Sequence, residues 1–126
     1  MFDHITVTVG DFRRAKAFYE LVLASLGMKS LAGDDKTYCG FGVERPAFWI
    51  AAAETPEPVS TSVHVAFVSA GKSQVDAFHL AAMSAGAKDN GAPGYHREYG
   101  AGYYAAFVFD LDGNNIEALY RDPTAR

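Results

Sequence analysis

Three residues of this 126-residue chain have the types and the spacing to hold a metal ion: His4, His64 and Glu117. Two neutral imidazoles and one carboxylate bind Zn, Ni, Mn or Fe(II) and leave coordination positions open for water or a substrate. The sequence therefore predicts a divalent metal site with these three side chains in one cavity. The alternative is that both histidines are hydrogen-bonded structural residues and that Glu117 is a solvated edge charge.

Strand periodicity places the three candidate ligands on equivalent faces. Each lies in a segment whose apolar residues alternate with other residues, as in a strand that has one side covered by a helix. His4 and His64 are sixty positions apart and have the same phase relative to these apolar residues. The apolar residues expected to face the helices are Ile5, Val7, Val9, Val63, Val65, Phe67, Ile116 and Ala118.

The elements that must position these residues occur twice. A strand over 2–9 precedes a helix that Asp11 caps and that runs to about Leu26, and a strand over 62–70 precedes a helix from about Ser73 to Ala85. Up to three strands fit 28–53, and a hairpin with a turn at Asp112-Gly113 fits 102–120. A long loop with a short strand is expected over 89–101.

This repetition predicts one α+β domain over 1–126, made by duplication of about sixty residues. The first repeat covers about 2–53 and the second about 61–122, with a Pro-containing linker at about 54–60. Each repeat has the element order βαβββ.

Aromatic and basic residues crowd the segment before and inside the last hairpin. We expect them to contact a small-molecule substrate by stacking and hydrogen bonding, although a rim of amphipathic surface is an equally good interpretation. These residues are Tyr95, His96, Arg97, Tyr99 and Tyr103.

Composition excludes several other classes of function. The net charge is −4 and the basic residues are scattered, so we expect no nucleic-acid partner. No apolar run approaches the roughly 18 residues of a membrane span, so we expect a soluble protein without a membrane partner. Cys39 is the only cysteine, so no intramolecular disulfide can form and the cytoplasm is the expected compartment.

The segments HITVTV, DFRRAKAFYELVLASLG and YYAAFVFDLDGNNIEALY together resemble the glyoxalase, bleomycin resistance and extradiol dioxygenase superfamily, also called vicinal oxygen chelate proteins. The resemblance covers essentially the whole chain, and its most specific part is the stretch from Asp110 to Glu117. It implies two tandem βαβββ modules forming a curled mixed sheet with helices packed outside. It also implies that His4, His64 and Glu117 are metal ligands and that two chains pair as a homodimer.

The resemblance implies a lyase or isomerase of the lactoylglutathione lyase type, or a related enzyme acting on a substrate chelated through vicinal oxygens. Lactoylglutathione lyases of this superfamily have a further ligand in the fourth strand, where this chain has Trp49, so the catalytic base is assigned to Glu117. Trp49 is instead expected to contact the substrate. Two alternatives stay open: a protein that sequesters a drug without turnover, and an extradiol ring-cleaving dioxygenase.

Overall fold

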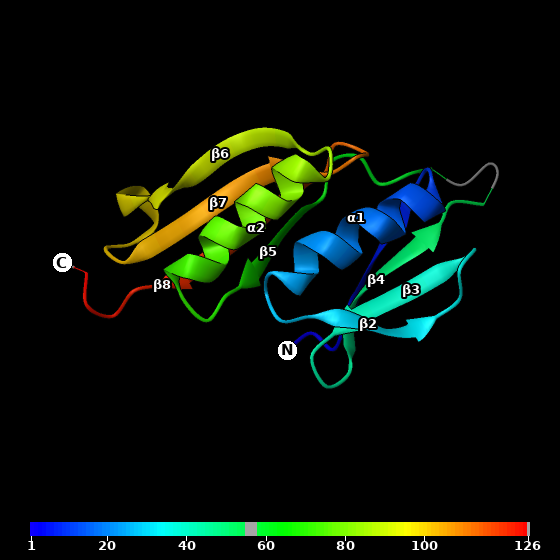
Figure 1. The fold of residues 1–126 in the computed structure, drawn as a ribbon, viewed down its shortest axis with the longest axis horizontal. Helices are drawn as coiled ribbons and strands as arrows, with labels where there is room; N and C mark the ends of the chain where they lie inside the picture. The colour runs from blue at the N-terminus through cyan, green and yellow to red at the C-terminus, as the bar shows by residue number, and fades with distance from the viewer. Residues whose placement is uncertain (55–57, 126) are drawn as a thin grey trace.

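The computed structural model describes residues 1–54 and 58–125, and it shows two halves with the same order of elements (Figure 1). The first half contains β1 (Ile5–Val9), α1 (Phe12–Ala24), β2 (Lys29–Gly33), β3 (Tyr38–Gly42) and β4 (Pro46–Ala52). The second half contains β5 (His64–Val68), α2 (Lys72–Ser84), β6 (Lys88–Tyr95), the short 3₁₀ helix η1 (Arg97–Tyr99), β7 (Tyr103–Phe109) and β8 (Asn115–Arg121). Part of the expected linker, residues 55–57, lies outside the described residues.

Each half forms its own four-stranded mixed sheet. The strand orders are β1-β4-β3-β2 and β5-β8-β7-β6, and in both sheets the first strand pairs in parallel with the last strand of its half. The predicted α+β fold with two βαβββ modules is confirmed. Among the described residues the strands form two sheets that are not closed on one another, rather than a single continuous one.

The two helices begin and end where local chemistry allows. The carboxylate of Asp11 accepts a hydrogen bond from the backbone N–H of Arg14 and so caps α1. Gly27 and Gly86, which follow the two helices, have φ values of +79° and +101°, a conformation that favours glycine. Neither helix in the described part of the chain is long and apolar enough to cross a membrane.

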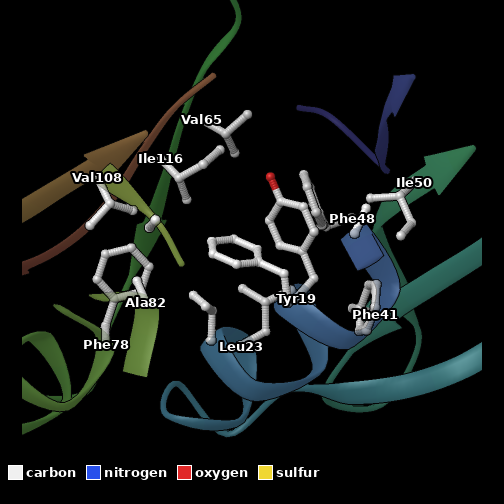
Figure 2. Close-up of a cluster of buried hydrophobic side chains, with 14 of the residues drawn as sticks. Tyr19, Leu23, Phe41, Phe48, Ile50, Val65, Phe78, Ala82, Val108 and Ile116 are labelled. Atoms are coloured by element: carbon white, nitrogen blue, oxygen red, sulfur yellow. The ribbon is translucent and has the colours of Figure 1, made fainter. Parts of the chain in front are cut away.

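One apolar core joins the two halves. Both helices cover one face of their own sheet and pack against each other, so side chains from all four layers meet (Figure 2). Tyr19 and Leu23 of α1 lie in the same cluster as Phe78 of α2 and Ile116 of β8. The face of each sheet that the helices do not cover lies outside this core and is called the open face. The candidate ligands lie on the open faces.

A buried polar connection reinforces this junction. The hydroxyl of Tyr19 donates a hydrogen bond of 2.5 Å to the carboxylate of Asp110 in the turn before β8. Asn114 in the same turn is fully buried, donates to the carbonyl of Ser60 and accepts from the N–H of Val63. The Asp-x-Asp-Gly-Asn turn therefore fixes the second half both to α1 and to the segment that enters β5.

The expected long loop over 89–101 is mostly a strand, which corrects the sequence-based prediction. β6 runs for eight residues and pairs with β7 despite containing Gly91, Pro93 and Gly94. It lies at the edge of its sheet, and the register shifts between Asp89 and Gly91 and again between Gly91 and Gly94. Edge position and bulges accommodate Gly and Pro, which would disrupt a central strand.

Candidate metal and substrate site

His64 and Glu117 form a pair on the open face of the second sheet. They come from the adjacent parallel strands β5 and β8, and Nε2 of His64 lies 2.8 Å from Oε1 of Glu117. The Glu117 side chain is 3% exposed, whereas that of His64 is 52% exposed. A buried carboxylate thus lies against a histidine that is half exposed.

Tyr103 holds the other oxygen of the same carboxylate. Its hydroxyl donates a short hydrogen bond to Oε2 of Glu117 across the β7–β8 pair. Burial, followed by this hydrogen bond, raises the pKa of Tyr103 to about 12. The guanidinium of Arg121 lies 5.1 Å from the centre of the Tyr103 ring. Glu117 is therefore oriented through both oxygens, with Oε1 turned toward the accessible histidine.

Aromatic rings continue from this pair across the open face. Phe107 lies beside His64, with ring centroids 6.3 Å apart, and His96 packs edge-on against Phe107 at 5.2 Å. Tyr99 stacks on His96 and contacts Tyr103 edge-on. The structure thus brings three of the predicted substrate-contacting residues into one group with Glu117: His96, Tyr99 and Tyr103.

His4 lies on the open face of the first half, away from this pair. Its Nδ1 is 2.6 Å from the carboxylate of Asp3, and it lines a pocket of about 300 Å³ with Asp3, Arg45, Pro46 and Trp49. The hydrogen bond from His4, and then the charge of Arg45, lower the pKa of Asp3. No three His, Cys, Asp or Glu side chains within the described parts of one chain are grouped so that they could hold a metal ion. Within one chain, His4 and the His64–Glu117 pair therefore lie in separate places.

The pairing register makes Trp49 the counterpart of Glu117. In the first half Trp49 pairs with Thr6 on β1, two residues after His4, and in the second half Glu117 pairs with Ala66 on β5, two residues after His64. Both pairs are parallel and join the first and last strands of their half. The two halves therefore share this strand register but carry different side chains there: histidine with tryptophan in the first half, and histidine with glutamate in the second.

One predicted substrate residue, Tyr95, lies on the other face of the sheet. Tyr95 pairs with Tyr104 on the helix-covered side, where its hydroxyl accepts from Lys72 and donates to Asp122. Arg97 is exposed on η1.

Sequence reasoning missed Asp3, Phe107 and Arg121. Phe107 has the same strand phase as Tyr103, so the alternation along 103–109 carried the signal that places it on the open face. Asp3 and Arg121 carried no such signal, because their roles depend on contacts with particular side chains.

The fold is a duplicated βαβββ module, and His64 and Glu117 lie at the strand positions that His4 and Trp49 have in the first module. These features define a class of proteins with two paired modules and a candidate site on the open face of a sheet. The sequence matches the family model of the Glyoxalase/Bleomycin resistance protein/Dioxygenase superfamily over residues 1–118. The chain belongs to this superfamily. A search of the curated proteins found no match.

Several solved structures are similar over almost the whole chain. A glyoxalase/bleomycin resistance protein from Albidiferax ferrireducens is 29% identical with a TM-score of 0.83, and the match covers 97% of this chain and 99% of that one. A lactoylglutathione lyase from Agrobacterium tumefaciens is 20% identical with a TM-score of 0.67, covering 95% and 92%. A mutant of the fosfomycin resistance protein FosX from Listeria monocytogenes, solved with Mn(II) and a dihydroxypropylphosphonic acid, is 15% identical with a TM-score of 0.67, covering 94% and 88%. The last two likenesses show the fold alone.

Proposed function

We propose that this protein is a divalent-metal-dependent enzyme of the lyase or isomerase type that acts on a small substrate bound through two neighbouring oxygens. The observation that carries the proposal is the 2.8 Å approach of His64 Nε2 to the buried Oε1 of Glu117. Two structural neighbours, a lactoylglutathione lyase and a protein solved with Mn(II), support it. We place the activity in the cytoplasm, since the only cysteine, Cys39, is a buried free thiol.

The His64–Glu117 pair fits a metal ion by its donor chemistry. Two ligands at right angles around a cation, each roughly 2.1 Å from it, are about 3 Å apart. The observed separation of 2.8 Å between Nε2 and Oε1 is close to that spacing. One imidazole and one carboxylate still need at least one more protein ligand to make an ordinary catalytic site.

We assign that third ligand to His4 of a second copy of the chain. Nδ1 of His4 is hydrogen-bonded to Asp3, which leaves Nε2 as the free ring nitrogen. A ligating histidine whose other nitrogen is hydrogen-bonded to a carboxylate is a usual arrangement. A two-fold homodimer pairs the first half of one chain with the second half of the other, and does so twice. The proposed enzyme is therefore a homodimer with two composite sites.

A bound divalent cation would act as a Lewis acid that stabilises negative charge developing on the substrate oxygens. The side chains of this protein have separate tasks. Tyr103 holds Oε2 of Glu117, so that Oε1 keeps its direction toward His64. We assign the proton-abstracting role to Glu117, because the equivalent first-half position is occupied by Trp49, which cannot accept a proton. His96 and Tyr99 lie beside this carboxylate and are assigned to substrate contact.

The proposal is tested first by metal analysis of protein purified without chelators. We expect close to one ion per chain in the unmodified protein and a loss of that ion in His64→Ala; a metal-free unmodified protein that also fails to take up Zn, Ni, Mn or Fe(II) would overturn it. The lyase assignment is tested separately with the hemithioacetal of methylglyoxal and glutathione. No rate above background with Zn, Ni, Mn or Co would remove that substrate while leaving the metal site standing.

A second function, binding of a small molecule without turnover, is favoured by one observation. Trp49 occupies in the first half the position that Glu117 has in the second, and aromatic rings lie beside Glu117. Ligand-dependent quenching of Trp49 fluorescence that persists with EDTA and in Glu117→Gln, without any metal-dependent reaction, would support this function over an enzyme.

A further inference from the structure

Trp49 lies flat on the first sheet because the neighbouring strand provides no side chain beneath it. Gly40 on β3 pairs directly with Trp49. A methyl group at Gly40 would lie 2.8 Å from Cε2 and 2.9 Å from Cδ2, the two atoms shared by the indole rings. Real Cβ atoms do not approach other atoms so closely. The centre of the indole therefore rests over the Gly40 backbone, with one face against the strand.

The same positions in the second half have the opposite arrangement. Phe107 pairs with Glu117 on β7 and β8, where Gly40 pairs with Trp49 on β3 and β4. The large residue is thus on β4 in one half and on β7 in the other. In the first half this leaves a broad ring next to His4, since both line the same pocket.

Two further side chains lie beside the indole, and the ring of Tyr38 stacks on part of it. The ring of Tyr38 lies within 26° of parallel to the indole, with centroids 5.9 Å apart. Arg45 lines the pocket beside Trp49, and its only ion pair among the described residues is a long one of 3.4 Å to Asp3. Asp3 is already hydrogen-bonded to His4 at 2.6 Å. Most of the guanidinium N–H groups of Arg45 are therefore available to an anion.

We propose that the Trp49–Tyr38–Arg45 surface binds a flat aromatic ring that carries a carboxylate. The ring stacks on the indole and the carboxylate pairs with Arg45, a planar donor suited to it. This inference deepens the proposed function by naming the substrate class of the same site. Shape selects the ring, because a puckered saturated ring cannot lie against a plane over its whole area. The positive charge of Arg45 favours an acid over a neutral compound.

Trp49 is the only tryptophan, so it reports its own occupancy. We would titrate ¹⁵N-labelled protein with 2-naphthoate, its fully saturated decahydro analogue and the neutral 2-naphthylmethanol, all with EDTA present, following the single indole N–H signal. We expect 2-naphthoate to shift this signal and to bind several times more tightly than either control. Equal binding of the saturated acid, or an unmoved indole signal, would overturn the proposal.

Variants separate the parts of the surface. Measured by calorimetry, because the variant has no indole signal, Trp49→Leu should weaken binding of 2-naphthoate by about fivefold to tenfold, the loss expected for one aromatic stack. Gly40→Ala should displace the indole and weaken binding similarly, and Arg45→Gln should remove the preference for the acid over the alcohol. Val43→Ala, on the adjoining exposed turn, is the matched control and should bind normally. Normal binding by Trp49→Leu would contradict the proposal. Because EDTA is present throughout, a missing metal site leaves the result unchanged.

Discussion

The hydroxyl of Tyr19 in the first half donates a 2.5 Å hydrogen bond to the carboxylate of Asp110 in the second. Both residues are buried, and burial followed by the charge of Asp110 raises the pKa of Tyr19 well above its ordinary value. This bond lies within the core that joins the two halves, so their relative orientation is fixed by packing. His4 therefore stays apart from Glu117 within one chain as a property of the fold, which is why the proposed third ligand comes from a second chain.

Removing this hydroxyl tests how strongly the halves are joined. Tyr19→Phe should lower the free energy of unfolding by about 1–3 kcal/mol, because it leaves the Asp110 carboxylate buried with one partner fewer. Urea denaturation measures the change. Tyr38→Phe, whose hydroxyl lies on the open face, is the matched control and should stay within about 0.5 kcal/mol of the unmodified protein. Equal effects of the two substitutions would show that the bond does not contribute specifically.

The ionisation of Tyr103 should depend on Glu117. Its pKa is raised from 10.0 to about 12, so the folded protein holds this proton more tightly than the unfolded chain does. The resulting stabilisation is complete below about pH 10 and is lost as the pH rises toward 12. Glu117→Gln removes the adjacent negative charge and should move the Tyr103 ionisation to lower pH. The ultraviolet tyrosinate absorbance of the two proteins, with Tyr103→Phe as the reference, measures this shift; superimposable titrations would argue against the contact.

Two tyrosines of the second sheet should differ in their effect on metal affinity. Tyr103→Phe leaves Oε2 of Glu117 without its donor and should weaken binding of Ni²⁺ by roughly 10–100-fold, as loss of a partner behind a ligand usually does. Tyr95→Phe removes a hydroxyl bonded to Lys72 and Asp122 on the opposite side of the sheet. Its Ni²⁺ affinity, measured by calorimetry, should be unchanged. A reversal of this order would contradict the placement of the site.

The sequence predicted the fold because its signals are local and repeated. Strand alternation around Val7 and Val65, the Asp11 cap and the glycines after both helices all correspond to observed elements. The β6 prediction was wrong because its Gly and Pro residues indicate a loop unless the edge position and bulges are known. Strand periodicity also predicts only the face of the sheet on which a side chain lies.

For the site, periodicity could not predict which faces meet. The sequence predicted one cavity for His4, His64 and Glu117, but among the described residues of one chain no three such side chains are grouped to hold a metal ion, since such grouping depends on how the halves pack. The position of Tyr95 was hidden for a related reason: its partners, Lys72 and Asp122, are 23 and 27 residues away in sequence.

The proposed enzyme depends most directly on completion of each metal site by a second chain, and a mixed dimer tests this. His4→Ala and His64→Ala chains, carrying different affinity tags, would be co-expressed, the heterodimer isolated through both tags, and its Ni²⁺ content measured after dialysis. Neither mutant homodimer has an intact site. The heterodimer combines His64 and Glu117 of one chain with His4 of the other, so it should retain about one ion per dimer. A heterodimer as empty as its parents, or an unmodified protein that holds its ion as a monomer, would contradict the account.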